Sequence, residues 1–143
     1  MKPEPVIKNG DPLKPSMARE MKLAGEKRSS KTIYRASVNL TNHLTVEAKA
    51  RSFSFFIDEP ASFGDADKGP NPEEALRAAV GACQAITAAL YAAFLELSIK
   101  RYEIALKGYA DLAGFYGVSE KPTGFERVVG EITLESDSPA EKL

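Results

Sequence analysis

The chain has 143 residues, a mass of 15.5 kDa and an apolar content of 43%, which is enough for one domain with its own core. Its formal net charge of −1 gives no overall attraction to nucleic acid or to an anionic membrane. One cysteine and one histidine exclude an internal disulfide and a classical zinc site, and they favour a reducing, cytoplasmic location without a metal or cofactor.

The first 35 residues are basic, with nine Lys or Arg against four Asp or Glu. These basic residues are scattered, so we interpret them as part of a solvated arm, with binding to an acidic partner as the alternative. The opening MKPEPVIKNGDPLKP lacks the apolar segment of a secretory signal. No apolar run reaches the roughly 20 residues of a bilayer span, so no membrane partner is expected.

Four prolines predict an extended arm over the first dozen residues. The following SMAREMKLAGEKRS predicts a short helix that Ser16 caps and that ends near Gly25. We therefore divide the chain into an N-terminal arm over residues 1–31 and a domain over residues 32–143.

An alternation of apolar and polar residues begins at Thr32 and predicts a strand, followed by a turn at TNHL. The stretch from Thr45 to Ile57 predicts a second extended run, in which Arg51 is in phase with Phe53 and Phe55. A lone buried charge is costly. Arg51 is therefore expected at the rim of the core or beside an anionic partner.

The polar loop DEPASFGDADKGPN precedes a long helix. Asn71 is a good N-cap, Pro72 suits the first helical position, and Glu74 completes a capping box. The helix is predicted to run to about Leu97, with one apolar stripe formed by Leu76, Val80, Cys83, Ile86 or Thr87, Leu90, Phe94 and Leu97.

The opposite side of this helix is also nearly uncharged, because alanines occupy seven of its positions between 78 and 93. A helix that is apolar all round is buried all round, and one small sheet cannot cover it. Small residues also allow a second helix to approach closely. We therefore expect a homodimer that encloses the helix.

Two further extended runs follow, Arg101 to Ala110 and Phe125 to Leu134, joined by a long hairpin connection. The terminal SDSPAEKL has the pattern of a helix start, with Ser138 as N-cap and Pro139 at the first helical position. We expect a further segment beyond this point in the natural protein.

With these elements placed, DEPASFGDADKGPNPEEALRAAVGAC resembles the osmotically induced protein C and organic hydroperoxide resistance (OsmC/Ohr) family. Members carry Gly-x-Asn-Pro-Glu and a cysteine ten residues beyond that glutamate. The family glutamate then corresponds to Glu73 and the reactive cysteine to Cys83. A looser similarity extends from about Tyr34 to Ser138.

The resemblance implies an α+β fold in which antiparallel sheets wrap long central helices of an intertwined homodimer, with active sites at the subunit interface. It implies a thiol-dependent peroxidase for organic, including lipid-type, hydroperoxides. In such members a thiolate becomes a sulfenic acid, a second cysteine forms a disulfide with it, and a dithiol reductant resets the pair.

Two features depart from the family pattern. The chain has no second cysteine, so either the segment that carries it is missing, as the terminal helix start suggests, or an external thiol resolves the sulfenic acid. The loop LTNHLT lacks the arginine that the family places between its first two strands. Arg51 is the best substitute for that arginine, and Arg35 is the second choice.

The chemistry requires the thiolate, an arginine and Glu73 to lie close together. Arginine can hold a thiolate ionised, and Glu73 would orient its guanidinium. Ten helical residues put Glu73 about 15 Å from Cys83, so the glutamate is predicted to come from the other subunit's antiparallel helix. Phe53, Phe55, Ile86 and Leu90 are predicted to line a pocket for the alkyl tail of the substrate.

Two other functions stay open. The main alternative is a catalytically silent dimer of the same fold that binds an apolar small molecule. Another thiol activity, hydrolysis or sulfur transfer, is the third. Hydrolysis is disfavoured because His43, in a predicted turn, is the one histidine available as a base.

Overall fold

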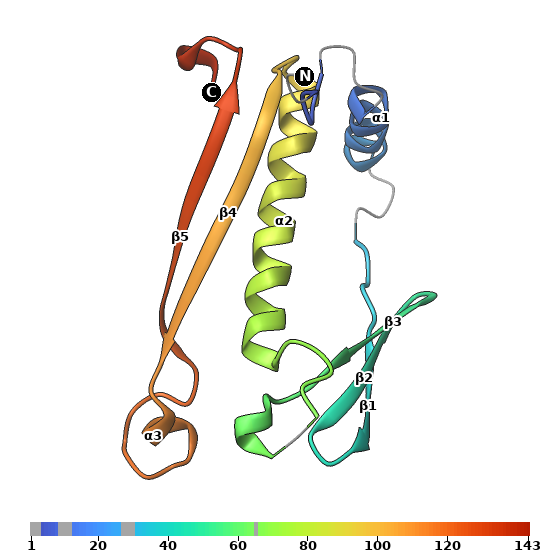
Figure 1. Cartoon of the computed structure of the whole chain (residues 1–143). Coiled ribbons are helices and arrows are strands. Elements are labelled where there is room, and N and C mark those ends of the chain that lie inside the picture. Colours follow the sequence, from blue (N-terminus) through green and yellow to red (C-terminus); the bar gives the residue numbers. More distant parts are fainter. Residues whose placement is uncertain (1–3, 9–12, 27–30, 65) are drawn as a thin grey trace. The chain divides into compact units, whose positions relative to one another are not determined.

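The computed structural model has an α+β fold of antiparallel strands and one long helix (Figure 1). It forms two compact units, one over residues 31–79 and one that joins residues 1–30 to 80–143. The α+β class predicted from the sequence is confirmed, whereas the arm and domain limits stay a prediction. The structure describes residues 4–8, 13–26, 31–64 and 66–143.

The unit over residues 31–79 contains a three-stranded antiparallel sheet in the order β1-β2-β3. Its strands are β1 Ser37–Asn42, β2 Thr45–Ala50 and β3 Phe53–Ile57. Cross-strand pairing places Val38, Ala48 and Phe55 in one row, so one face of the sheet is apolar. Val38 and Phe55 are nevertheless exposed.

The structure corrects the bounds of the first two extended runs that were predicted from the sequence. The first strand begins at Ser37 rather than Thr32, because its pairing starts at Ser37 opposite Lys49 and β2 ends one residue later. The predicted run from Thr45 to Ile57 is two strands, since Arg51 and Ser52 turn the chain between Ala50 and Phe53.

The long helix α2 spans Pro72–Phe94 and begins as predicted. Asn71 Oδ1 accepts a hydrogen bond from the Glu74 amide at 2.9 Å, and the Asn71 amide donates to Glu74 Oε2 at 3.0 Å. The helix ends before the predicted Leu97. Glu96 has a φ of 59° and the Leu97 amide bonds to the Ala92 carbonyl at 2.8 Å, which is a Schellman-type end.

The second unit holds a two-stranded antiparallel ribbon of β4 Ile99–Ala110 and β5 Phe125–Ser136. These bounds confirm the two predicted strands to within two residues at each end. Tyr102 pairs with Leu134, and Ile104 pairs with Ile132. The apolar residues therefore share one face of the ribbon, as predicted. The connection between the strands contains a short helix that was not predicted, α3 Leu112–Phe115.

From Val80 onwards, helix α2 lies along this ribbon (Figure 1). A Cβ atom added to Gly81 would lie 3.3 Å from Leu106 Cδ1 and 3.4 Å from Ile104 Cγ2, and Ala92 and Ala93 are buried. The small residues thus bring the helix close to its own ribbon. The expectation that the alanines of α2 face a second helix stays a prediction.

The N-terminal segment joins the core of the second unit. Ile7 forms an antiparallel bridge with Ile99 and packs in a cluster with Ala92, Ala93 and Leu97. The following helix, α1 Leu13–Gly25, ends where it was predicted to end. It starts three residues before Ser16, so Ser16 lies inside the helix rather than at its cap.

The C-terminal segment contains a 3-10 helix, η2 Ala140–Lys142, in place of the predicted α-helix start. Ser138 does not cap it. Instead, Ser138 Oγ accepts a hydrogen bond from the Ser98 amide at 3.0 Å, which ties the end of the ribbon to the start of β4. Ser138 therefore bonds to the backbone next to β4 and does not cap the helix.

Candidate functional site

Cys83 lies on the face of α2 that points away from the ribbon. It follows Gly81 by two positions, which is about 200° around a helix, and its side chain is exposed with a free thiol. Val80, Ile86 and Leu90 share this face by helical spacing, and Ile86 is 62% exposed. The sulfur is therefore accessible to a substrate, and a nucleophilic thiol also needs a nearby positive group that favours the thiolate.

Glu73 lies in the first turn of α2, where a carboxylate favourably opposes the helix dipole. It is half-buried. The helix between Glu73 and Cys83 is continuous, so their separation along its axis is about 15 Å. The two residues therefore cannot share a site within one straight helix, as the sequence also indicated.

Glu59 lies near the start of α2 and was not singled out from the sequence. Partial burial raises the pKa of Glu59 above its ordinary value, and the nearby carboxylates of Glu73, Asp58 and Glu74 raise it further. The β3–α2 connection therefore brings several carboxylates close together. All four belong to the motifs DEP and NPEE, but only the folded loop places them close together.

Replacing Glu59 by glutamine is expected to stabilise the protein at neutral pH. The folded Glu59 carboxyl binds its proton more tightly than the unfolded one, so unfolding releases a proton. Stability then falls as the pH rises from the ordinary carboxyl pKa through the raised one. Thermal unfolding from pH 4 to 8 should show a smaller loss for Glu59→Gln than for the wild type. Glu120→Gln, at an exposed carboxyl, is the control and should follow the wild type.

Arg51 occupies the turn between β2 and β3, with a φ of 56°. Its guanidinium carbon lies 5.1 Å from the ring centroid of Phe53, within the range of a cation–π interaction. The prediction that Arg51 lies on the apolar face of a strand is therefore wrong. The residue instead stands at the rim of that face, which was one of the two alternatives.

The four predicted pocket residues fall into two groups. Phe53 and Phe55 project from the apolar face of the β1–β3 sheet and are exposed. Ile86 and Leu90 lie beside Cys83 on α2. The structure brings Arg51 together with Phe53, and Cys83 together with Ile86 and Leu90. These two groups belong to different compact units, and their juxtaposition stays a prediction.

Asp58 is a buried, hydrogen-bonded residue that was not predicted from the sequence. Its side chain is 1% exposed and accepts hydrogen bonds from Thr45 Oγ1 at 3.1 Å, the Glu59 amide at 2.9 Å and the Lys68 amide at 2.9 Å. A buried carboxylate needs such donors. The signal was present in the DEP motif, but the motif alone does not say which acidic residue is buried.

Gly69 closes the same loop against β3. A Cβ atom there would lie 2.3 Å from the Phe56 carbonyl oxygen, which is backbone and cannot turn aside. Gly69→Ala is therefore expected to lower the free energy of unfolding by about 1–3 kcal/mol, measured by urea denaturation. Gly124→Ala is the matched control, because a Cβ at Gly124 meets nothing within 4 Å. Equal losses in the two variants would contradict the prediction.

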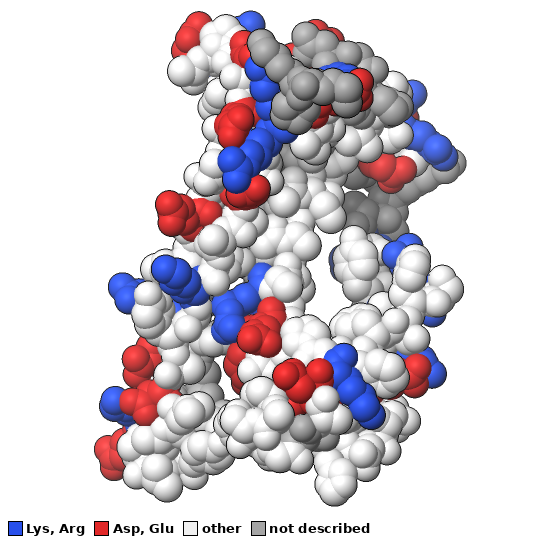
Figure 2. All heavy atoms as spheres, viewed as in Figure 1, with Lys and Arg blue, Asp and Glu red and all other residues white. Residues whose placement is uncertain are grey.

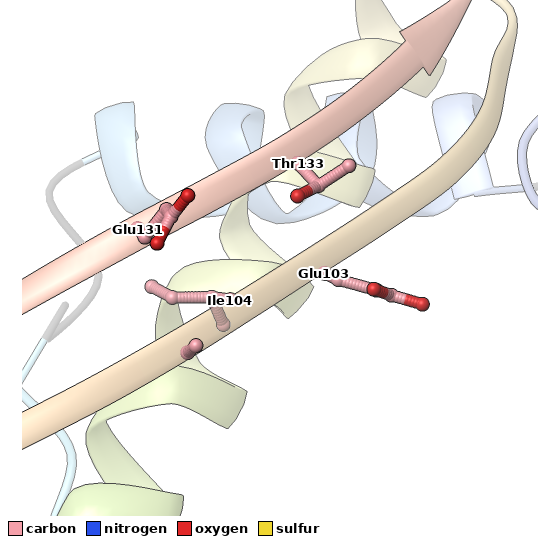
Figure 3. A pocket seen from close by; sticks show the side chains of 5 residues that line it. Glu103, Ile104, Glu131 and Thr133 are labelled. Carbon is pink, nitrogen blue, oxygen red and sulfur yellow. The ribbon is translucent and has the colours of Figure 1, made fainter.

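A shallow groove of about 500 Å³ lies on the β4–β5 ribbon (Figure 3). Glu103, Ile104, Ala105, Glu131 and Thr133 line it. This lining contains neither a nucleophilic thiol nor a cation. Within the described part of the chain, no group of three His, Cys, Asp or Glu residues is arranged to hold a metal ion. The candidate site is therefore the one around Cys83.

Charged side chains do not gather into one large patch on the face shown in Figure 2, where acidic and basic groups are interspersed. In the N-terminal segment, Lys14 pairs with Glu96 and Lys22 lies 3.7 Å from Glu26. Both pairs are consistent with the solvated surface that the scattered basic residues predicted.

These features define a class of protein: an α+β fold in which a capped, apolar helix presents one free cysteine. A family model for OsmC-like proteins matches residues 64–143, which is more than half of the chain. The protein belongs to the OsmC-like family. The family that the motif around Cys83 indicated is therefore confirmed.

One solved structure supports the same fold. It is that of an OsmC-like protein from Mycoplasma pneumoniae, which is 19% identical in sequence and superposes with a TM-score of 0.63. The similarity covers 78% of this chain and 75% of that chain. No curated protein sequence matches the chain.

Helix α2 is long and apolar enough to cross a membrane by length and composition. The prediction that no segment reaches this limit is therefore wrong. One face of α2 packs on its own ribbon at Gly81, near Ile104 and Leu106, but only 11% of the membrane-length window is buried within one chain.

Proposed function

We propose that the protein is a thiol-dependent peroxidase that reduces organic hydroperoxides through Cys83. The observation that carries this proposal is the exposure of Cys83 among apolar side chains on α2, within the segment that matches the OsmC-like family. Membership of this family supports a peroxidase-related role. The apolar surroundings favour a substrate with an alkyl chain, including lipid-type hydroperoxides, over hydrogen peroxide.

The proposed reaction begins with the Cys83 thiolate. Its sulfur attacks the terminal peroxide oxygen, the O–O bond breaks, and the leaving alkoxide takes a proton to become an alcohol. The sulfur is thereby oxidised to a sulfenic acid. A second thiol then condenses with the sulfenic acid to a disulfide, releasing water, and a dithiol reductant reduces this disulfide and returns Cys83 to the free thiol.

We propose further that a second copy of the chain completes the site. Two apolar faces are exposed, one on α2 around Ile86 and one on the β1–β3 sheet around Phe55, and such faces are typical of interfaces. Members of the family are commonly dimeric. In the dimer, Glu73 of the partner subunit orients the Arg51 guanidinium, which stays charged and stabilises the thiolate of Cys83.

Trapping of the sulfenic acid tests the peroxidase directly. The reduced protein is mixed with one equivalent of cumene hydroperoxide in the presence of dimedone, and the adduct is located by peptide mass spectrometry. We expect dimedone on Cys83 and one equivalent of cumyl alcohol. Faster labelling with hydrogen peroxide than with cumene hydroperoxide would contradict the proposed substrate class. Binding of the hydroperoxide without oxidation would favour the silent apolar-ligand dimer.

A further inference from the structure

Asp58 has no assigned part in the reaction, yet its carboxylate is both buried and hydrogen-bonded within the unit over residues 31–79. Among the described residues, Thr45 and Asp58 have the buried polar side chains. Three donors, Thr45 Oγ1 and the amides of Glu59 and Lys68, converge on the Asp58 carboxylate. A carboxylate with this degree of burial cannot itself touch a hydroperoxide in solution.

The bonds to Asp58 join three parts of the chain. Thr45 begins β2, Asp58 directly follows β3, and Lys68 lies ten residues later on the far side of the loop. The Asp58 amide also donates to the Pro70 carbonyl at 3.2 Å. The loop is thus closed at its base, with both of its ends held against the end of β3.

The closed base leads directly into the start of α2. Asn71 follows Pro70, and its capping box with Glu74 begins the helix. Glu73 is therefore three residues from a carbonyl that the Asp58 backbone holds. A short, rigid path of this kind transmits the position of Asp58 to Glu73, whereas a free loop of ten residues would not.

We propose that Asp58 is a positioning residue that holds Glu73 in register with β3 for the reaction at Cys83. The inference rests on the proposed function, because Glu73 acts in catalysis only if the protein is a thiol peroxidase. A displacement of a catalytic group by about 1 Å can cost about 100-fold in rate. Loss of the Asp58 bonds therefore has a kinetic effect apart from its effect on stability.

Asp58→Asn tests this geometry because it keeps the shape of the side chain. Its amide group can still accept from Thr45 and Glu59, but it presents an N–H group to the Lys68 amide, and that bond is lost. Hydrogen exchange at the Lys68 and Asn71 amides should become faster. The rate constant for oxidation of Cys83 by cumene hydroperoxide should fall about 10- to 100-fold.

A double-mutant cycle with Glu73→Gln separates positioning from simple stabilisation. If Asp58 acts through Glu73, then Asp58→Asn should change the rate less than about twofold in the Glu73→Gln background. The melting temperature should fall equally in both backgrounds. Asp67→Asn removes a carboxylate from an exposed site in the same loop and is the matched control, with wild-type rate and exchange.

Equal rate losses in both backgrounds would overturn the proposal, since Asp58 would then act on the fold alone. Unchanged exchange at Lys68 would overturn it too. If Asp58→Asn does not fold, Thr45→Val removes one bond to the same carboxylate at nearly constant volume, and the same coupling to Glu73 is expected. A wild-type rate in Glu73→Gln would overturn the kinetic role of Asp58 and leave the peroxidase intact. No oxidation of Cys83 in the wild type would overturn the proposed function and with it that kinetic role. Amide exchange would still show whether Asp58 positions the start of α2.

Discussion

Cys83→Ser is expected to lower hydroperoxide turnover by at least about 1,000-fold, because removal of a nucleophile leaves binding without chemistry. Serine has nearly the same size, but its hydroxyl is not ionised near neutral pH and does not form a stable product with peroxide oxygen. The measurement is the consumption of cumene hydroperoxide with a dithiol in excess, followed for the wild type and the variant at equal protein concentration.

The similar size of cysteine and serine makes this variant a clean test. A volume-conserving substitution usually has a small effect on stability, so the melting temperature should stay close to that of the wild type. Gln84→Ala, at the next exposed position of the same helix, is the control and should keep the full rate. Equal turnover by the wild type and Cys83→Ser would eliminate the peroxidase and favour the apolar-ligand alternative.

Ile86→Glu is expected to separate the proposed dimer into monomers. Ile86 is 62% exposed in one chain and lies on the same face of α2 as Cys83. In the dimer this face is covered, so a glutamate there would be a desolvated charge without a partner. The dissociation constant should rise at least about 100-fold, measured by sedimentation equilibrium over a range of protein concentrations.

Activity provides the second measurement for the same variant. Because Glu73 of the partner subunit completes the proposed site, the monomer should lose turnover in parallel with dissociation, although Cys83 is intact. Gln84→Glu adds the same charge at an exposed polar position of α2 and should stay dimeric and active. A monomeric Ile86→Glu with wild-type turnover would show that one chain holds the whole site.

The start of α2 was predictable because its determinants are local. Asn71 and Glu74 are three residues apart and bond to each other's backbone, so their pattern needs no distant partner. The ribbon strands were predictable for a similar reason, since alternation with a period of two follows from the pleat itself. The motif that contains Glu73 and Cys83 is also local, and it led to the family.

The turn at Arg51 could not be predicted in this way. It has none of the Gly or Asn residues that usually supply a positive φ in tight hairpins, and the apolar phase continues across it. Only the pairing of Ala50 with Phe53 defines the turn. The role of Asp58 was hidden for a related reason, because two of its donors are backbone amides that carry no sequence signature.

The sequence alone determined the class of fold, the capped helix, the family, and the correspondence of Cys83 to the family's reactive cysteine. The pattern behind each of these lies between residues that are close in the sequence. Only the tertiary structure decided which face of α2 packs on its own ribbon and which face leaves Cys83 exposed. Both faces are apolar, and the difference is one of size: Gly81 allows the ribbon to approach within van der Waals contact, whereas the larger side chains on the Cys83 face do not.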